Sequence, residues 1–279
     1  MEAIKESLKW LILGGSGQLG SELVTLLERQ KSHYLAPNSG KLDISRSEAV
    51  RSSILSYNPD VVVNAAAWTD VDGAETHLAA ANQINALGPK AIAGACRSVG
   101  AKFFQMSTDY VFSGEAKLPF EVNDTKLPKS VYGRTKSDSE DFVLSIYPEG
   151  SYIFRTAWLY SRFGKNFAKT MVRFALQDEN DRPVVDDQYG QPTSARDLAK
   201  QIFASVEFGS KPGIYHATNS GQATWNEFAK EIFSLLGENP KRIVSQKSAD
   251  VNRPAPRPAY SVLSHKCWEN SGVSPMRDW

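Results

Sequence analysis

Tyr132 and Lys136 stand four positions apart in the segment VYGRTK, and this spacing suits proton transfer. Residues four apart on an α-helix lie on one face, so the two side chains can meet. A tyrosine has an ordinary pKa of about 10, and a nearby ammonium stabilises its phenolate and moves that pKa toward neutrality. The pair therefore indicates general acid-base chemistry on a substrate oxygen. Alone it would be weak, because both residues are common on helix surfaces.

A hydroxyl-bearing segment, STDYVF, lies upstream of this pair at 107–112. It follows the apolar run at 102–106, which we expect to be a buried strand of a parallel sheet. Ligands of open α/β sheets bind outside the carboxyl ends of the strands, so Thr108 is placed to donate a hydrogen bond to a substrate carbonyl. The alternative role of Ser107 and Thr108 is simply to end the strand. Their occurrence in order with the tyrosine and lysine favours catalysis.

The segment GGSGQLG places Gly14, Gly17 and Gly20 at three-residue spacing. It follows an expected first strand at 11–13 and opens an amphipathic helix over about 18–30. Glycines permit a sharp turn and the close approach of a pyrophosphate, while the helix N-terminus offers unpaired N–H groups and the positive end of its dipole. This context favours a dinucleotide site over a plain tight turn.

The end of the second strand bears on which cofactor is used. It is expected near 35–38, where an NAD-selective domain carries an acid that binds the ribose 2′-hydroxyl. The sequence there is LAPN, without an acid, which leaves room for a 2′-phosphate. This favours NADPH, with NADH as the alternative. Lys41 is the nearest cation, and Asp43 is either a contact to the adenine edge or a solvated surface residue.

The elements around these motifs predict an α/β fold with a doubly wound parallel Rossmann sheet. Short apolar runs at 11–13, 60–64 and 102–106 alternate with helix-period segments, as in βαβ units. In the second half of the chain the alternation is less regular and prolines recur. We therefore expect an NAD(P)-binding domain at 1–160 and a smaller, mainly substrate-binding domain at 161–279, interleaved with the first.

Composition points to a small-molecule partner. The chain has 279 residues, 41% of them hydrophobic, and 32 basic against 31 acidic residues, so no charge excess favours nucleic acid or an anionic membrane. The opening MEAIKESLKW lacks a signal-peptide core and no stretch approaches a membrane span, which predicts a cytoplasmic protein. Two distant cysteines and four scattered histidines predict reduced thiols and no metal site. A monomer and a homodimer both remain open.

Longer motifs add a family resemblance. The chain resembles the extended short-chain dehydrogenases/reductases, and among them most closely the dTDP-4-dehydrorhamnose reductase family, over nearly its whole length. The motifs that carry the resemblance are GGSGQLG, VVVNAAAWTDVDGAE, ALGPKAIAGAC, STDYVFSG, VYGRTK, FRTAWLY, NFAKTM, DQYGQPTSARDLA, GIYHATNSG and RPAYSVL. DQYGQPT and RPAYSVL lie outside the parts shared by all such dehydrogenases, so they indicate this family in particular.

This resemblance implies hydride transfer from NAD(P)H to the C4 keto group of a dTDP-4-keto-6-deoxyhexose, converting dTDP-4-dehydrorhamnose to dTDP-L-rhamnose. It implies a catalytic triad of Thr108, Tyr132 and Lys136. The cofactor would contact this tyrosine and lysine together with Gly14, Ser16, Gly17, Gln18, Leu19, Asp43, Ile44, Asn64, Ala65 and Ala66. The dTDP-sugar would contact Thr108, Trp158, Asn166, Phe167, Gln191 and Arg257. An aromatic ring can pack on sugar or base and a guanidinium can pair with diphosphate oxygens, whereas a core tryptophan and a surface arginine are the alternative roles.

The chain departs from the family pattern at three places. Gly73 stands where the family often has lysine, the serines and aspartate at 137–139 replace a more apolar sequence that contains glycine, and the chain stops at Trp279 where relatives continue into a final helix. These departures bear on substrate preference and on the second domain rather than on the triad.

Two other functions share parts of the resemblance. One is a non-catalytic regulatory subunit, because the methionine adenosyltransferase beta subunit resembles this family and keeps the tyrosine and lysine. The other is a nucleotide-sugar epimerase or dehydratase, which would keep its nicotinamide bound through a cycle. Trp158 and the intact DQYGQPT favour the reductase over the regulatory subunit. Stoichiometric NAD(P)H oxidation separates the three.

Overall fold

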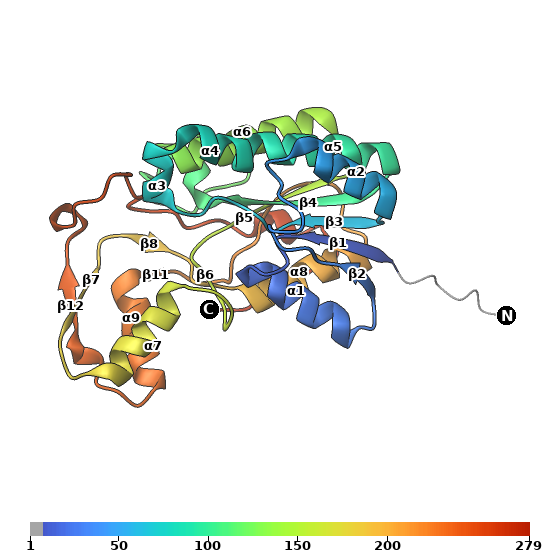
Figure 1. The fold of residues 1–279 in the computed structure, drawn as a ribbon. Coiled ribbons are helices and arrows are strands. Elements are labelled where there is room, and N and C mark those ends of the chain that lie inside the picture. The colour runs from blue at the N-terminus through green and yellow to red at the C-terminus, as the bar shows by residue number, and fades with distance from the viewer. Residues whose placement is uncertain (1–7) are drawn as a thin grey trace.

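A parallel sheet of six strands forms the centre of the molecule (Figure 1). The computed structural model describes residues 8–279. Most of the opening segment for which no signal peptide was expected, residues 1–7, lies outside this range. The strand order is β10-β5-β4-β3-β1-β2, and every neighbouring pair is parallel. These strands are β1 (Lys9–Leu13), β2 (His33–Leu35), β3 (Val61–Asn64), β4 (Lys102–Thr108), β5 (Ser151–Thr156) and β10 (Gly213–His216). The predicted Rossmann sheet is confirmed.

Helices cover both faces of this sheet, as a doubly wound fold requires. In Figure 1, α2 to α6 lie above the sheet, and α1 and α8 lie below it. The upper helices are α2 (Ser47–Tyr57), α3 (Val71–Thr76), α4 (Leu78–Asn82), α5 (Gly88–Val99) and α6 (Val131–Ile146). The lower helices are α1 (Gln18–Arg29) and α8 (Ala195–Glu207). A π-helical turn, Gln83–Leu87, joins α4 to α5.

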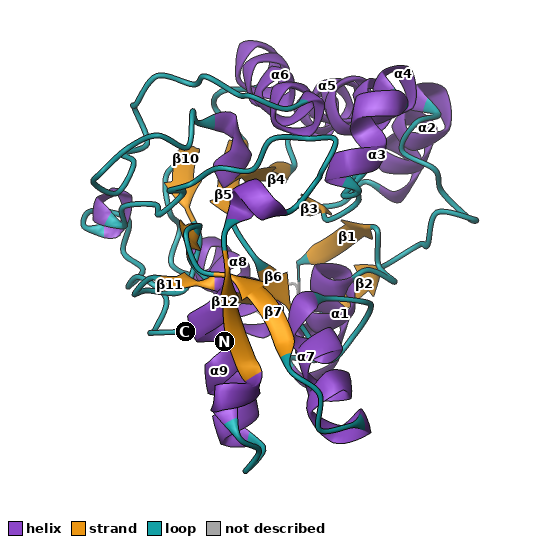
Figure 2. Cartoon of the chain, turned by 90° about the vertical axis from the view of Figure 1, so that its left-hand side faces the viewer, coloured by secondary structure: helices purple, strands orange, loops and turns teal. Residues whose placement is uncertain are grey.

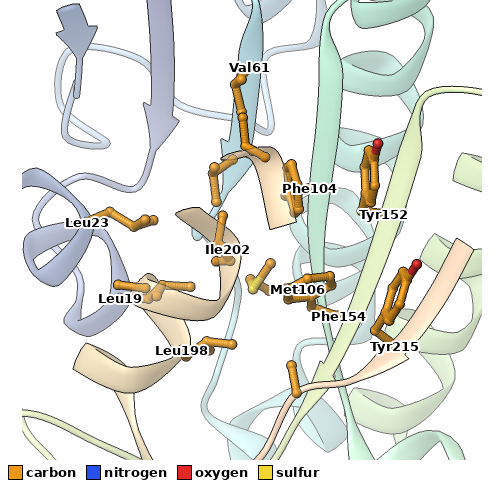
Figure 3. Close-up of a cluster of buried hydrophobic side chains, with 14 of the residues drawn as sticks. Leu19, Leu23, Val61, Phe104, Met106, Tyr152, Phe154, Leu198, Ile202 and Tyr215 are labelled. Atoms are coloured by element: carbon orange, nitrogen blue, oxygen red, sulfur yellow. The ribbon is translucent and has the colours of Figure 1, made fainter. Parts of the chain in front are cut away.

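Side chains along each strand alternate between two hydrophobic cores. In β1, Trp10 belongs to the core on the side of α1, whereas Leu11 belongs to the core on the opposite side. Figure 3 shows the first of these cores, where Leu19 of α1 and Ile202 of α8 face Phe104 of β4. Because both faces of the sheet are covered, the strands read as continuous apolar runs in the sequence.

A smaller lobe stands at one side of the sheet (Figure 2). Its helices and strands are α7 (Phe167–Gln177), α9 (Trp225–Leu235), β6 (Leu159–Tyr160), β7 (Arg182–Val185), β8 (Tyr189–Gly190), β9 (Thr193–Ser194), β11 (Ala223–Thr224) and β12 (Ile243–Gln246). The strands form three two-stranded sheets, β7 with β12, β8 with β11 and β6 with β9. Met171, Phe228 and Ile243 lie in a separate core of this lobe.

Part of the second half of the chain returns to the main sheet. β10 pairs with β5, and α8 packs beside α1 below the sheet. We therefore propose that these segments complete the NAD(P)-binding unit expected at 1–160. The remainder of 161–279 would then form the substrate-binding unit.

The elements predicted for the first half of the chain are found with small shifts in their bounds. The helix expected over about 18–30 is Gln18–Arg29. The apolar run at 60–64 contains all of β3, and the run at 102–106 forms most of β4. The second strand ends at Leu35, slightly earlier than expected. Within residues 8–279, no helix has the length and apolar character needed to cross a membrane.

Candidate active site

The glycine loop after β1 is folded so tightly that two of its glycines leave no room for a side chain. Gly14 has a φ of +79°, and a Cβ atom there would lie 2.7 Å from the backbone nitrogen of Ala66. A Cβ atom on Gly20 would collide with the carbonyl oxygen of Gly14. The loop, the first turn of α1 and the end of β3 are therefore in direct contact.

The N-terminus of α1 is open to an anion. Gly17 is the N-cap and is exposed, and no side chain of the described part of the chain caps the helix there. The N–H groups of Gln18 and Leu19 in the first turn therefore remain available, together with the positive end of the helix dipole. Ser16 is exposed beside them, whereas the side chain of Leu19 is buried in the core and leaves only its backbone for a ligand. This arrangement fits a pyrophosphate.

Asn64 holds the loop after β3 against the glycine turn. Its Nδ2 donates to Oε1 of Gln105 at 2.8 Å, and its Oδ1 accepts from the backbone nitrogen of Ala66 at 3.2 Å. The segment from Asn64 through Ala65 to Ala66 thus lies directly beside Gly14. Gln105, fully buried in β4, was not predicted, although a glutamine within an apolar strand run is a signal that could have found it.

Asp43 and Ile44 lie in the loop between β2 and α2. Oδ1 of Asp43 accepts from the backbone nitrogen of Ser45 at 2.9 Å, and this hydrogen bond holds the pKa of Asp43 below its usual range. Ile44 is buried, and its carbonyl oxygen lies close to Gly88 at the start of α5. Their contact with the cofactor stays a prediction.

Helix α6 carries Tyr132 and Lys136 and approaches the end of β4 closely. Ser130 caps the helix by accepting the N–H of Gly133 at 3.1 Å. A Cβ atom on Gly133 would collide with the carbonyl oxygen of Tyr110, so a glycine is needed for this approach. The rings of Tyr110 and Tyr132 meet edge to face, with their centroids 5.6 Å apart.

Tyr132 is half-buried, and its phenol is neutral over the ordinary pH range. Burial raises the pKa of Tyr132 to about 12. The Thr108 hydroxyl beside it acts in the opposite direction, and the charge of Asp109 raises the pKa further. The Tyr132 phenol therefore keeps its proton at neutral pH. A positive charge close to the ring would lower this pKa and ease the release of the proton.

Lys136 lies one turn further along α6. Its side chain is 2% exposed, and Nζ donates to the carbonyl oxygen of Met106 in β4. Burial lowers the pKa of Lys136 to about 8, while the carboxylate of Glu140 acts in the opposite direction. The amine is therefore mostly cationic at neutral pH.

A buried ion pair anchors α6 to the sheet. Glu140 accepts two hydrogen bonds from Arg155 of β5, at 2.9 and 2.7 Å, and one from the Ser107 hydroxyl of β4 at 2.5 Å. The side chains of the ion pair are 1% exposed or less. Helix α6 is thus fixed to two neighbouring strands. This ion pair was not predicted, although an arginine within an apolar strand indicates that an acid must lie nearby.

Thr108 is the last residue of β4. Its hydroxyl donates to Oδ1 of Asp109 at 2.8 Å and accepts from the backbone nitrogen of Tyr110 at 3.2 Å. The structure thus brings the three predicted catalytic residues, Thr108, Tyr132 and Lys136, to the carboxyl end of β4. The hydrogen bond from the Thr108 hydroxyl to Asp109 was not predicted from the sequence.

Asn85 connects the loop after β3 to α6. It lies in the π-helical turn, where Oδ1 accepts from the backbone nitrogen of Trp68 at 2.9 Å. Its Nδ2 donates to the Trp68 carbonyl at 3.1 Å and to Oγ1 of Thr135 at 3.2 Å. Asn85 was not predicted as a site residue. Periodicity gives no signal for a π-helical turn, although such turns are frequent at functional sites.

The predicted aromatic residues of the sugar side lie in one cluster. Trp158 has a φ of +44° and stacks on Trp225 with ring centroids 3.6 Å apart. A Cβ atom on Gly190 would collide with the Trp158 ring, so this glycine makes room for it. The Phe167 ring centroid is 4.7 Å from that of Trp225. Both predicted rings therefore have packing partners within the protein.

The predicted amides of the sugar side are engaged in internal hydrogen bonds. Asn166 caps α7, and its Nδ2 donates to Oε1 of Gln18 at 3.0 Å, which connects the second lobe to α1. Gln191 is 2% exposed. Its Oε1 accepts from the Thr218 hydroxyl at 2.9 Å and from the backbone nitrogen of Leu263 at 2.8 Å. Their contact with a substrate stays a prediction.

Arg257 forms an ion pair with Asp72 of α3. Nη1 and Nη2 donate to the two carboxylate oxygens at 2.9 and 2.7 Å, and the backbone nitrogen of Ala255 adds a third bond at 3.1 Å. The Arg257 hydrogen bond is the main cause that holds the pKa of Asp72 below its usual range. Arg257 also lines a cavity of about 350 Å³ beside Tyr110 and Ser130. To bind a diphosphate it would have to share or release Asp72.

A parallel Rossmann sheet, a glycine turn at the first βα junction and a Tyr-x-x-x-Lys helix set against the end of β4 define a protein of the short-chain dehydrogenase/reductase class. The family follows from comparison with known proteins. The chain belongs to the RmlD substrate binding domain family, whose model matches residues 8–279.

Relatives match along the whole chain and confirm the resemblance found in the sequence. The dTDP-4-dehydrorhamnose reductase of Streptomyces griseus is 47% identical, covering 97% of this chain and 90% of that protein. The probable dTDP-4,6-dihydroxy-2-methyloxan-3-one 4-ketoreductase of Streptomyces antibioticus is 44% identical, covering 98% and 92%. The crystal structure of the Bacillus anthracis dTDP-4-dehydrorhamnose reductase in complex with NADP has a TM-score of 0.93 at 33% identity and covers 98% of this chain and 96% of that chain.

Proposed function

We propose that this protein is an NADPH-dependent reductase of the C4 keto group of a dTDP-4-keto-6-deoxyhexose. The observation that carries the proposal is the meeting of Thr108, Tyr132 and Lys136 at the end of β4, beyond a glycine turn that fits a pyrophosphate. The names of the relatives agree on reduction of dTDP-bound keto sugars. They differ in the sugar, so our more specific proposal, conversion of dTDP-4-dehydrorhamnose to dTDP-L-rhamnose, depends on the relatives named as rhamnose enzymes.

In this proposal the residues of the site divide between binding the cofactor and acting on the keto group. The N–H groups at the start of α1 would hold the pyrophosphate of the cofactor, and Asn64 to Ala66 would line the cofactor beside the glycine turn. When bound, a reduced nicotinamide supplies the hydride. Tyr132 donates its proton to the C4 oxygen, Lys136 lowers the pKa of that phenol, and Thr108 donates a hydrogen bond to the same oxygen.

The choice of NADPH depends on the end of β2. Residues 35–38 at the end of β2 include no acid, and Asn38 is exposed. A 2′-phosphate would therefore meet no carboxylate at these residues. The Bacillus anthracis relative was solved with NADP. NADH remains the alternative cofactor.

The test incubates the purified protein with stereoisomers of dTDP-4-keto-6-deoxyhexose and follows the absorbance of NADPH and NADH in separate assays. The expected result is oxidation of one NADPH per sugar reduced, fastest with the 4-keto sugar of the rhamnose configuration. A faster reaction with another stereoisomer would overturn the specific product and keep the class. Tight cofactor binding without oxidation by any stereoisomer would contradict the reductase and favour the regulatory subunit.

A further inference from the structure

Asp109, directly after Thr108, has a buried carboxyl group, and one of its two oxygens accepts no hydrogen bond from the described residues. Its side chain is 2% exposed, and Oδ1 accepts the Thr108 hydroxyl at 2.8 Å. Oδ2 is buried and has no hydrogen-bond partner among residues 8–279. An unpartnered carboxylate oxygen in such a place is costly, whereas a neutral carboxylic acid needs fewer partners.

The hydroxyl of Thr108 has one proton and two acceptor positions. In the structure the proton is donated to Asp109, and one acceptor position takes the backbone N–H of Tyr110 at 3.2 Å. While Asp109 is ionised, Thr108 therefore has no proton left for a keto oxygen. If Asp109 carried a proton and donated it to Oγ1, both acceptor positions of Thr108 would be filled and its own proton would be released.

Resting on the proposed reductase activity, we propose that Asp109 is a positioning residue that sets the direction of the Thr108 hydroxyl. In its neutral form the Asp109 carboxyl group donates to Oγ1 of Thr108, and Thr108 then donates to the C4 keto oxygen of the substrate. In its ionised form the Asp109 carboxylate takes the Thr108 proton and turns this donor away from the substrate.

The surroundings of Asp109 raise the pKa of its carboxyl group toward neutrality. Burial raises the pKa of Asp109 to about 6, while two nearby hydroxyls act in the opposite direction: that of Ser261, whose own hydrogen bond goes to the carbonyl oxygen of Tyr189, and that of Thr108. The groups that face it are Thr108 of β4, Tyr110 of its own turn, Tyr132 of α6 and Ser261 of the C-terminal segment. Arg257 acts on the neighbouring Tyr110. Ligands that exclude water from this end of β4 would raise the pKa of Asp109 further, because burial favours the neutral carboxyl group.

The first test compares pH profiles of kcat/KM for the wild type, Asp109→Asn and the control Asp181→Asn. The asparagine amide can donate to Thr108 at every pH, so it reproduces the neutral carboxyl group. Above the pKa of Asp109, we expect kcat/KM of the wild type and the control to fall by up to about tenfold per pH unit toward a lower plateau. Asp109→Asn should lack this fall and lose activity only at higher pH, where Lys136 is deprotonated. Identical profiles for all three proteins would overturn the proposal.

A second pair of variants separates action through Thr108 from a merely structural role. In a Thr108→Ala background, Asp109→Asn should leave the pH profile unchanged, because the hydroxyl that it directs is gone. If Asp109→Asn alters the profile equally with and without Thr108, the carboxyl group acts elsewhere and the proposal is wrong.

A spectroscopic titration tests the same hydrogen bond without turnover. The infrared band of the protonated carboxyl group that disappears in Asp109→Asn reports the pKa of Asp109. Thr108→Val removes a donor to the carboxylate and should raise this pKa. An unchanged pKa in Thr108→Val would overturn the inference even if the wild type reduced no sugar, whereas failure of turnover alone would contradict only the proposed function.

Discussion

The two sides of the candidate site differ in how their polar groups are used. On the side of the sheet, α6 is fixed through Glu140, Arg155 and Ser107, and the Tyr132 that it carries lies beside the Thr108 hydroxyl. On the side of the smaller lobe, the predicted substrate residues Asn166 and Gln191 are held by internal hydrogen bonds.

This difference shows where the site is complete and where it depends on a ligand. Helix α6, which carries Tyr132 and Lys136, is held by a buried ion pair, so these two residues need little rearrangement to act. The groups that would recognise the sugar nucleotide must share or exchange hydrogen bonds that they already make. Catalytic chemistry is therefore easier to assign from this structure than sugar specificity.

The largest expected effect is on the sheet side, from Tyr132→Phe. The variant keeps the ring and its packing on Tyr110 but removes the proton donor. General acid catalysis contributes ~10²- to 10⁴-fold, so kcat should fall by that amount while cofactor affinity stays close to wild type. Steady-state kinetics and cofactor titration measure the two quantities. Tyr34→Phe, at a half-buried tyrosine whose hydroxyl donates to Glu28, is the matched control and should keep full activity. Retention of most turnover by Tyr132→Phe would remove this residue from the mechanism.

The anchor of the catalytic helix should show next as a loss of stability. Glu140→Ala leaves Arg155 buried without its acid, and breaking a buried ion pair in this way costs about 3–5 kcal/mol of the free energy of unfolding. Glu149→Ala breaks an ion pair with Arg97 whose side chains are 61% and 63% exposed, and should cost less than about 1 kcal/mol. Urea unfolding of both variants gives the comparison. Similar small losses would show that the ion pair does not hold α6 in place.

Substitution of Arg257 tests whether this residue can exchange its ion pair with Asp72 for a bond to the substrate diphosphate. If it binds the diphosphate, Arg257→Ala should raise KM for the dTDP-sugar about tenfold or more, because a charge-assisted hydrogen bond contributes ~1.5–3 kcal/mol. KM for the cofactor should hardly change. In that case Asp72→Ala, which removes the competing acid, should leave KM for the sugar equal to or below that of the wild type. If both variants raise the two KM values and lower the melting temperature together, the ion pair with Asp72 is structural.

The smallest effect should come from the cofactor edge. Asn38→Asp places a carboxylate after β2, where it attracts a ribose 2′-hydroxyl and repels a 2′-phosphate. The preference for NADPH over NADH in kcat/KM should fall roughly fivefold, which corresponds to about 1 kcal/mol. Asn180→Asp adds the same charge at an exposed position before β7 and should change nothing. A wild type that strictly requires NADH would contradict the interpretation of this strand end.

Local sequence features predicted the central strands and the glycine turn, and they indicated the candidate catalytic residues. The apolar runs at 11–13, 60–64 and 102–106 found three central strands, because both faces of a parallel sheet are buried. The glycine turn was readable because only glycine tolerates the contact between Gly14 and Ala66. Both features depend on residues that are close together in the sequence, so they can be recognised without the fold.

Long-range partners were not predictable in the same way. Arg257 meets Asp72, and Gln105 meets Asn64, across large separations in the sequence, and no periodicity pairs them. Asp109 was overlooked for another reason. It lies within the motif STDYVF, but its importance comes from burial and from an unpartnered oxygen, which become visible only once the surrounding elements are in place.

Transfer of deuterium from the nicotinamide to the sugar tests the proposed chemistry at the end of β4 most directly. The protein is incubated with NADPH deuterated at C4 of the nicotinamide and with a dTDP-4-keto-6-deoxyhexose, and the product is examined by NMR. We predict one deuterium at C4 of the sugar for each cofactor oxidised, at a rate lowered ~10²- to 10⁴-fold in Tyr132→Phe. A sugar product without deuterium at C4, or formed without net oxidation of the cofactor, would contradict the reductase and favour an epimerase or dehydratase.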